Sequence, residues 1–276
     1  MTRDEIIACA KRFVCDSTGN YVSAESAIGK EQAGMRLFDE PVFGFGHVDD
    51  EMYERYKSAE AIGPHFLAPP EWMSSVKTVI SFFLPYSEQI KQANSINYEW
   101  PADEWLHARY EGQIFLKGFA INMQNLLIDA GYKSIIPSFD ERFKSGDSRD
   151  KSGVVTNRFT SNWSERHIAY ACGLGTFGLS KGLITEKGIC GRFGSILTEL
   201  NLPKDTRQYS DIYEYCTMCG KCIANCPVDA ISSDGKMDLP CSDFLDKILD
   251  KHNPRYGCGK CQVGVPCMSM APGAKA

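Results

Sequence analysis

The chain has 276 residues, of which 43% are hydrophobic, and a formal net charge of −5. This length and composition provide enough apolar material for one domain of ordinary size and a smaller second module. The acidic balance, and the scattering of 30 Lys and Arg without a basic run, argue against generic nucleic-acid binding while allowing a local basic patch.

The first predicted element is an amphipathic helix in TRDEIIACAKRFVCDSTG, at the N-terminus. Thr2 provides an N-cap, and acidic residues follow in the first turn. Apolar side chains recur on one face at helical spacing: Ile6, Ala10, Phe13 and Val14. From Gly19 to Pro70 the periodicity is weak, which predicts a long irregular segment or short helices around DDEMYERYKSAE.

Strands and helices alternate in the middle of the chain. The apolar run VKTVISFFLPY predicts a buried strand from Val76 to Leu84, ended by Pro85. A long helix follows in DEWLHARYEGQIFLKGFAINMQNLLIDAG and runs into Gly131, before a second strand in YKSIIPSF. ERFKSGDSRDKSG reads as a polar loop, and SERHIAYACGLG as a helix capped near Ser164 and stopped by glycines. This alternation predicts an α/β core.

The glycine-rich stretch GLGTFGLSKGL matches the dinucleotide pattern G-x-G-x-x-G. That fingerprint requires a strand before it and a helix opening at it, whereas here a helix comes before. The glycines still need a physical cause: Gly173, Gly175, Gly178 and Gly182. Either they form a tight turn with unusual dihedral angles, or their backbone lies flat against a large group.

The stretch CTMCGKCIANCPVDAIS carries the strongest signal. Its spacing C-x-x-C-x-x-C-x-x-x-C-P is the run that binds 4Fe-4S clusters, in which the fourth cysteine serves a second cluster. Two clusters need eight cysteines, and the C-terminal region supplies the other four: Cys241, Cys258, Cys261 and Cys267. Zinc is the alternative, but it prefers two separated C-x-x-C pairs. Reduced thiols in a protein without an export leader argue against disulfides.

The ferredoxin rule divides these cysteines into two sets. The first thiol set is Cys216, Cys219, Cys222 and Cys267. The second thiol set is Cys226, Cys241, Cys258 and Cys261. The second run is irregular, because Cys241 lies seventeen residues ahead of Cys258. The remaining cysteines lack ligand spacing and are interpreted as small apolar residues: Cys9, Cys15, Cys172 and Cys190.

The order HIAYACGLGTFGLSKGLIT, GRFGSILTEL and then the cysteine runs resembles the epoxyqueuosine reductases and the catalytic region of reductive dehalogenases. The likeness extends back through PPEWMSSVKTVISFFLPY. It implies an α/β (α+β) protein with a nitroreductase-like cobalamin-binding domain at 1–209, which includes the N-terminal helical segment, and a ferredoxin-like domain with two 4Fe-4S clusters at 210–276. It also implies a corrinoid face made by Gly173, Leu174, Gly175, Gly178, Gly194, Ser195, Ile196, Leu197 and Thr198.

The chain also departs from the family pattern. Epoxyqueuosine reductases carry an aspartate shortly before the Glu-Arg pair of the helix, whereas RFTSNWSERHIA has no acid before Glu165. DKHNPR lacks the glycine of the D-x-H-x-x-G pattern, so a corrinoid would bind without a protein histidine. The chain ends soon after the cysteines, without the helical extension that helps to hold tRNA. These departures argue against a tRNA substrate.

Several polar residues near the glycine segment in sequence are candidates for the chemistry. We predict Tyr170 as the proton donor, with Arg158 or Lys181 as electrostatic support. Each also has a purely structural interpretation, because helix residues at this spacing commonly pack or cap. Glu165 and His167 belong to the same group of candidates.

Two functions follow. The first is a cobalamin-dependent oxidoreductase that cleaves a C–O or C–halogen bond of a small molecule, fed by an external low-potential electron donor. The alternative is an electron-transfer protein that reduces a corrinoid held by a partner protein. The longest apolar stretches are shorter than the roughly 20 residues of a membrane span. Without an export leader, we expect a cytoplasmic protein from an anaerobic or low-oxygen setting.

Overall fold

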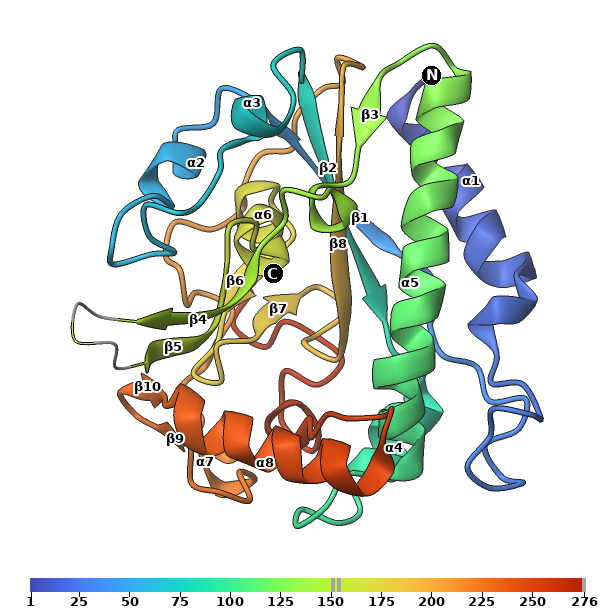
Figure 1. The fold of residues 1–276 in the computed structure, drawn as a ribbon, viewed down its shortest axis with the longest axis vertical. Coiled ribbons are helices and arrows are strands. Elements are labelled where there is room, and N and C mark those ends of the chain that lie inside the picture. Colours follow the sequence, from blue (N-terminus) through green and yellow to red (C-terminus); the bar gives the residue numbers. More distant parts are fainter. Residues whose placement is uncertain (150–151, 153–154, 275–276) are drawn as a thin grey trace.

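The computed structural model describes residues 1–149, 152 and 155–274. Its centre is a four-stranded antiparallel sheet in the order β1-β2-β8-β3 (Figure 1). The strands are β1 (Val42–His47), β2 (Thr78–Pro85), β8 (Gly191–Thr198) and β3 (Ser134–Ile135). The long helix α5 (Asp103–Asp129) and helix α1 (Arg3–Asp16) cover one face (Figure 1). Helix α6 (Glu165–Ala171) covers the other.

Strand β2 is buried along its whole length, as its apolar sequence predicts. Its alternate side chains enter different cores, because successive residues of a strand point to opposite faces. Phe82 and Leu84 pack in the core under α1 and α5. Val79 packs with Trp163 and Ile168 on the α6 side. Both faces of the sheet are therefore covered, and the α/β prediction is confirmed.

Short elements complete the first 209 residues. They are η1 (Thr18–Asn20), α2 (Met52–Arg55), α3 (Pro69–Trp72), α4 (Glu88–Asn94), η2 (Pro137–Phe139), β4 (Ser145–Arg149), β5 (Val155–Ser161), β6 (Gly175–Phe177) and β7 (Leu183–Thr185). Strands β4 and β5 pair as one hairpin, and β6 and β7 as another.

The C-terminal segment lies across the lower end of α5 in Figure 1. It comprises α7 (Lys221–Ala224), β9 (Ile231–Ser232), β10 (Gly235–Lys236), α8 (Asp238–His252) and η3 (Lys260–Gln262). Phe244 and Ile248 of α8 pack on Leu106 of α5, which attaches this segment to the body of the molecule. No helix in the described ranges is long and apolar enough to cross a membrane.

The predicted first helix is confirmed. The Thr2 side chain accepts a hydrogen bond from the Glu5 backbone, and the Glu5 carboxylate accepts one from the Thr2 backbone. This reciprocal pair is a capping box, which satisfies two of the otherwise unpaired N–H groups at the start of the helix. Ile6, Ala10 and Val14 are buried on the predicted face.

Two predictions about the strands were wrong. Strand β1 lies in the segment predicted to be irregular, and β4 lies inside the predicted loop and pairs with β5, which follows it. The predicted strand in YKSIIPSF is present as β3, but it has only two residues and is followed by η2. Strand β1 was missed because VFGFGH contains two glycines. A Cβ at Gly44 would lie 2.4 Å from the Cys172 carbonyl oxygen, so the glycines let the end of α6 pack directly on this strand.

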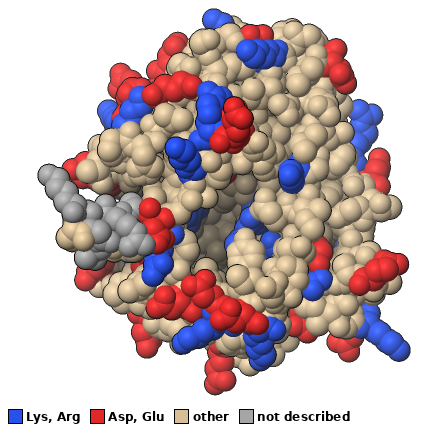
Figure 2. Space-filling view, viewed as in Figure 1, with Lys and Arg blue, Asp and Glu red and all other residues tan. Residues whose placement is uncertain are grey.

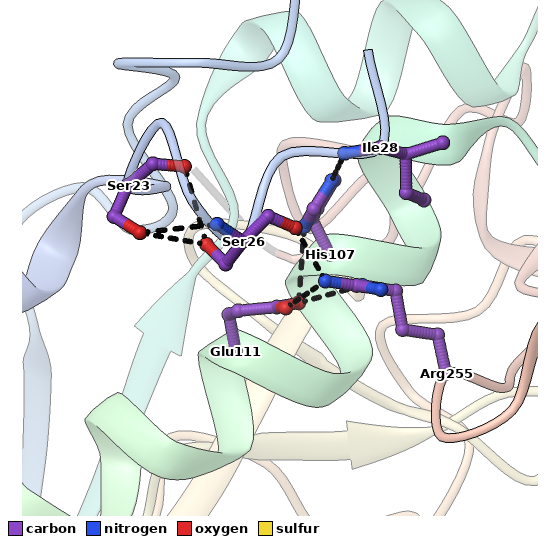
Figure 3. A network of polar contacts seen from close by, with 6 residues as sticks. All are labelled: Ser23, Ser26, Ile28, His107, Glu111 and Arg255. Carbon is purple, nitrogen blue, oxygen red and sulfur yellow. Dashed lines mark hydrogen bonds and ion pairs between the residues drawn. The ribbon is translucent and has the colours of Figure 1, made fainter.

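A buried polar network ties three distant segments together (Figure 3). The Ile28 backbone N–H donates to Nε2 of His107 (3.1 Å), so the ring proton is on Nδ1, which donates to Glu111 (3.0 Å). Arg255 pairs with both oxygens of the same carboxylate and donates to the Ser26 carbonyl oxygen (2.5 Å). The loop before Cys258 is thereby fixed to α5 and to the N-terminal segment.

Replacing Glu111 by Gln is expected to lower the free energy of unfolding by about 1–3 kcal/mol at neutral pH, because the half-buried Arg255 loses its ion-pair partner. Burial raises the pKa of Glu111, but the bonds from His107 and Arg255 outweigh it and the net pKa is lowered. A lowered pKa stabilises the fold above the unfolded value and loses this contribution as the pH falls through the folded value. The difference between the two proteins should therefore shrink below about pH 4.5.

Anoxic thermal unfolding followed by circular dichroism would measure this difference at several pH values. Glu60→Gln is a matched control at an exposed position and should leave the melting temperature unchanged. Equal melting temperatures for Glu111→Gln and the control at pH 7 would contradict the stabilising role of the network.

Candidate functional site: two thiol-lined cavities

The four cysteines of the first thiol set line one small cavity of about 20 Å³. Most of its lining comes from the loop that begins at Cys216, the turn at Gly178–Ser180 and the segment ending at Cys267. Gly178 lies close to the thiols, since a Cβ there would stand 3.7 Å from Sγ of Cys216. The structure thus brings together the four cysteines that the spacing rule grouped.

The four cysteines of the second thiol set lie in the wall of a larger cavity of about 400 Å³. Helix α8 contributes Cys241, and the loop around η3 contributes Cys258 and Cys261. Asn94 at the end of α4 holds this loop, because its side chain donates to the Cys258 carbonyl oxygen (3.0 Å) and accepts from Lys260 (2.8 Å). Again the members of the predicted set share one cavity.

Burial raises the pKa of four of these thiols, and neighbouring thiols raise it further: Cys222, Cys258, Cys261 and Cys267. The pKa is about 11 for Cys222 and about 12 for Cys258 and Cys267. Clustered thiolates therefore need positive charge, which iron supplies when it deprotonates its ligands. Across the described residues, no three thiols, imidazoles or carboxylates converge to hold a single metal ion. Each set surrounds a space, and the donor set fits a cluster better than one zinc ion.

The remaining cysteines differ among themselves. Cys172 and Cys190 are buried, as predicted for small apolar residues. Cys15 is exposed and Cys9 is only half-buried, with the Arg12 guanidinium donating to its sulfur (3.3 Å). The apolar interpretation was wrong for Cys15 and Cys9, because both lie on the outer side of α1, away from its buried face.

The larger cavity has a cationic wall. Its basic residues come from four elements or their flanks: Arg109, Arg166, Arg192 and Lys236. Arg109 stacks over the ring of Tyr256 at 4.8 Å. Burial lowers the pKa of Arg166, whose guanidinium donates to the Lys181 carbonyl oxygen (2.6 Å). Figure 2 shows Lys and Arg side chains in the hollow at the centre of this face, while charges of both signs mix around it.

Aromatic side chains form another part of the same wall: Tyr86, Trp105, Phe159, Phe193 and Phe244. Trp105 packs on the second thiol loop, since a Cβ at Gly259 would lie 1.9 Å from its ring. Its indole N–H is buried without a hydrogen-bond partner among the described residues. A polar atom left unpaired beside a cavity is available to a bound molecule.

Glu165 is the only carboxylate among the described residues of this wall. The Trp163 indole N–H donates to the Ser195 hydroxyl (2.9 Å), so that hydroxyl uses its own hydrogen to donate to Oε2 of Glu165 (2.6 Å). Oε1 is buried and has no partner within the described part of the chain. Burial raises the pKa of Glu165 to about 7. The sequence showed Glu165 as a helix N-terminal residue but gave no sign of its burial.

The three predicted catalytic residues lie outside the larger cavity. Tyr170 is buried against Phe177 and Tyr209 in a separate aromatic cluster. Arg158 lies on β5 and pairs with Asp147 (3.3 Å). Lys181 extends to Asp238 of α8 (3.2 Å), with half of its side chain exposed. Residues near them in the chain reach the cavity: Phe159, Glu165 and Gly182.

The residues predicted for a corrinoid face do not line the larger cavity either. Ser195, Ile196, Leu197 and Thr198 are buried inside the sheet, and Gly194 lies against the ring of Phe82. Leu174 is buried, Gly175 packs on the Ile184 carbonyl oxygen, and Gly173 has a positive φ of 85°. These glycines allow the chain to pack closely on itself, which is the tight-turn interpretation of the glycine-rich stretch. The cavity wall is instead made by Gly182 and Leu183 of the next turn and by Gly191, Arg192 and Phe193 at the start of β8.

The sequence matches the model of the 4Fe-4S binding domain at residues 209–232. A 4Fe-4S protein is therefore the class that the cysteine pattern defines. Two curated relatives are epoxyqueuosine reductases. The Aliivibrio fischeri protein is 31% identical over 115 residues, which are 37% of this chain and 30% of that protein. The Vibrio cholerae protein is 29% identical over 120 residues, 39% of this chain and 31% of that protein. The match thus spans about a third of the relatives' length.

Solved structures extend the likeness to the whole fold. A crystal structure of selenomethionine-labelled epoxyqueuosine reductase has a TM-score of 0.54 at 17% identity, and covers 99% of this chain and 68% of that one. An epoxyqueuosine reductase bound to an epoxyqueuosine-modified tRNA stem loop has a TM-score of 0.53 at 16% identity, over 96% of this chain and 65% of that one. The predicted resemblance to epoxyqueuosine reductases is confirmed. At sequence identities of 16–17%, the solved structures show that the fold is shared.

Proposed function

We propose that the chain is an iron-sulfur reductase whose reaction takes place in the larger cavity. The observation that carries this proposal is the position of the second thiol set, which forms part of the wall of a cavity with four cations and one carboxylate. A cluster held there would deliver electrons directly to a bound molecule. The cavity volume of about 400 Å³ is in the range of small-molecule sites.

The two thiol sets suggest the direction of electron flow. The first set lies at a small cavity with Cys219 exposed to solvent, which suits electron entry from an external low-potential donor. Cys222 of the first set lies close enough to Cys261 of the second for that thiol to raise its pKa. We propose two 4Fe-4S clusters, one in each set, with the second as the donor to the cavity.

The resemblance implies cobalamin as a further cofactor. The cavity wall fits such a group in part, because aromatic rings and cations suit a planar macrocycle with polar substituents. Gly182, Leu183 and Phe193 would line its face, and Arg192 would meet its polar edge. Cobalamin exceeds 400 Å³, so only part of it would lie inside. When bound, it would supply a strongly reducing cobalt centre. His252 accepts from the Trp100 indole (3.0 Å) and is not part of this wall.

The finer assignments belong to the same proposal. We place a nitroreductase-like cobalamin-binding domain at 1–209 and a ferredoxin-like domain at 210–276. The substrate is a small molecule with a reducible C–O or C–halogen bond, because the cations gather inside the cavity. On the face in Figure 2, charges of both signs are mixed, without the broad basic surface that tRNA phosphates favour. The alternative remains an electron carrier for a corrinoid protein.

Cobalamin binding separates these functions. Anoxically reconstituted protein should retain cobalamin through gel filtration, with a base-off spectrum. Arg192→Ala should lower retention, because it removes a cation from the cavity wall, whereas Lys57→Ala, a lysine outside this wall, should not. Unchanged spectra on titration with hydroxocobalamin would remove the cofactor from the proposal and favour the electron carrier.

The tRNA question has its own experiment. With both clusters reduced and cobalamin present, conversion of epoxyqueuosine-modified tRNA is expected to be slow or absent. A rate comparable to that of an epoxyqueuosine reductase assayed in parallel would overturn the small-molecule assignment while leaving the iron-sulfur reductase intact.

A further inference from the structure

The cavity of the proposed reductase needs a source of protons as well as electrons. Reductive cleavage of a C–O bond consumes two electrons and two protons: the bond breaks, carbon gains a hydrogen, and the leaving oxygen is protonated. The electrons come from the external donor through the clusters. Water can protonate a carbanion, but an alkoxide leaving group is helped by an acid placed beside it.

Glu165 lies in surroundings that favour the protonated form of its carboxyl group. Its carboxyl group forms part of the cavity wall, and its Oε2 already accepts the hydrogen of Ser195. The direction of that bond is fixed, since the indole of Trp163 can only donate. Oε1 has no hydrogen-bond partner among the described residues, so it is the oxygen of this carboxyl group to which a proton can bind.

The charged groups around the cavity leave this carboxyl group unpaired in the described part of the chain. They come from four of the elements at the wall, Arg109 of α5, Arg166 of α6, Arg192 of β8 and Lys236 of β10, while the residues that β5, β7, β9, α8 and η3 contribute to the wall carry no Lys, Arg, Asp or Glu. None of them is among the causes that set the pKa of Glu165, which are burial, raising it, and hydrogen bonds, lowering it. A carboxyl group at the N-terminus of α6 would ordinarily be ionised. Burial outweighs that effect here.

The other candidate acids of the region are less suitable. Burial raises the pKa of Tyr86 in the same wall far above neutrality. Burial also lowers the pKa of His167 to about 4, so its imidazole carries no spare proton at neutral pH. An efficient general acid has a pKa near the working pH, and Glu165 meets that condition.

We propose that Glu165 donates a proton to the substrate oxygen during reduction in the cavity, in place of the aspartate that is absent from the sequence before it. This proposal rests on the proposed function, because it takes the cavity as the reaction site. After the C–O bond breaks, the oxygen takes the proton of Glu165, the carboxylate remains, and water restores the proton before the next turnover.

The test uses Glu165→Gln, which keeps the shape of the side chain and its acceptor for Ser195. Infrared difference spectra of the anoxic holoprotein should show one protonated carboxyl band that disappears with a midpoint near pH 7. The band should be missing from Glu165→Gln at unchanged iron content. Ser195→Ala should move the midpoint upward, because the Ser195 bond favours the charged form. This shift would verify that the Ser195 hydrogen bond helps to set the pKa of Glu165, and the activity of the two proteins then tests its catalytic role.

Activity provides the second readout. With styrene oxide as the probe and titanium(III) citrate as the reductant, Glu165→Gln should reduce the epoxide about 10² to 10⁴ times more slowly than the wild type. The wild-type rate should fall above pH 7, while the slow rate of the variant stays flat. Equal rates in the two proteins, or the absence of a carboxyl group titrating near pH 7, would overturn the proposal. A titrating carboxyl group in a wild type that reduces no epoxide would count against the proposed function instead.

Discussion

Replacing Cys219 by Ala is expected to remove about four of eight irons per chain, because a 4Fe-4S cluster held by three thiolates is lost readily. The wild type should contain about eight irons and eight sulfides if each thiol set holds one cubane. Cys241→Ala should cause an equal loss from the other set. Iron and sulfide analysis of anoxically purified protein, together with the cluster absorption and electron paramagnetic resonance spectra, would measure both changes.

Cys15→Ala is the matched control, because this exposed cysteine lies on α1 and lines neither thiol cavity. Its iron content should equal that of the wild type. A wild-type content near four irons would refute the second cluster, and iron loss in Cys15→Ala would show that the ligand sets are misassigned. If only Cys241→Ala kept its full iron content, Cys241, the cysteine with the least regular spacing, would not be a ligand.

The second large effect is expected at Gly259, which lies between Cys258 and Cys261 of the second thiol set. Its φ of 67° costs a residue with a side chain about 1–2 kcal/mol. A Cβ would also stand 1.9 Å and 2.0 Å from two ring carbons of Trp105, so the loop has to move. Gly259→Ala should therefore lose the iron of the second set and lower the free energy of unfolding by about 2–5 kcal/mol in total.

Gly118→Ala is the control for this substitution. Gly118 lies in α5 with nothing within 4 Å of the added carbon, so alanine should stabilise the helix by about 0.5–1 kcal/mol. Combining Gly259→Ala with Trp105→Leu should restore part of the iron, because the steric overlap is relieved while the backbone strain stays. Full iron content in Gly259→Ala alone would show that the loop is looser than its packing indicates.

The glycine segment has a different role in the structure from the one that the resemblance implies. The sequence left open whether its glycines form a tight turn or face a large group. At Gly173 and Gly175 the structure favours the turn, because one has a positive φ and the other touches the chain of β7. Gly178 lies instead at the first thiol cavity. The sequence alone could not separate these cases, because a glycine can be required either by its backbone conformation or by a close neighbour, and the sequence does not show which.

The missed strand and hairpin have a related cause. Strand β1 contains glycines that weaken the apolar alternation, and β4 with β5 is built from polar residues of an exposed hairpin. In both cases pairing with a neighbouring strand supplies the order that local propensity lacks. Helix α1 and the long helix α5 could be predicted, because their capping residues or apolar periodicity involve residues that are close together in the sequence.

The sequence by itself predicted the division of eight cysteines into two groups, because the spacing of the run at Cys216 to Cys226 follows from cluster geometry, and the structure places each group at one cavity. It also determined the buried central strand and the main helices, whose signals are local. Only the tertiary structure decided which charges meet at the second thiol set. Arg109, Arg166 and Lys236 are far apart in the chain and converge through packing. The raised pKa of Glu165 also depends on packing, since burial by residues from other elements is its largest cause.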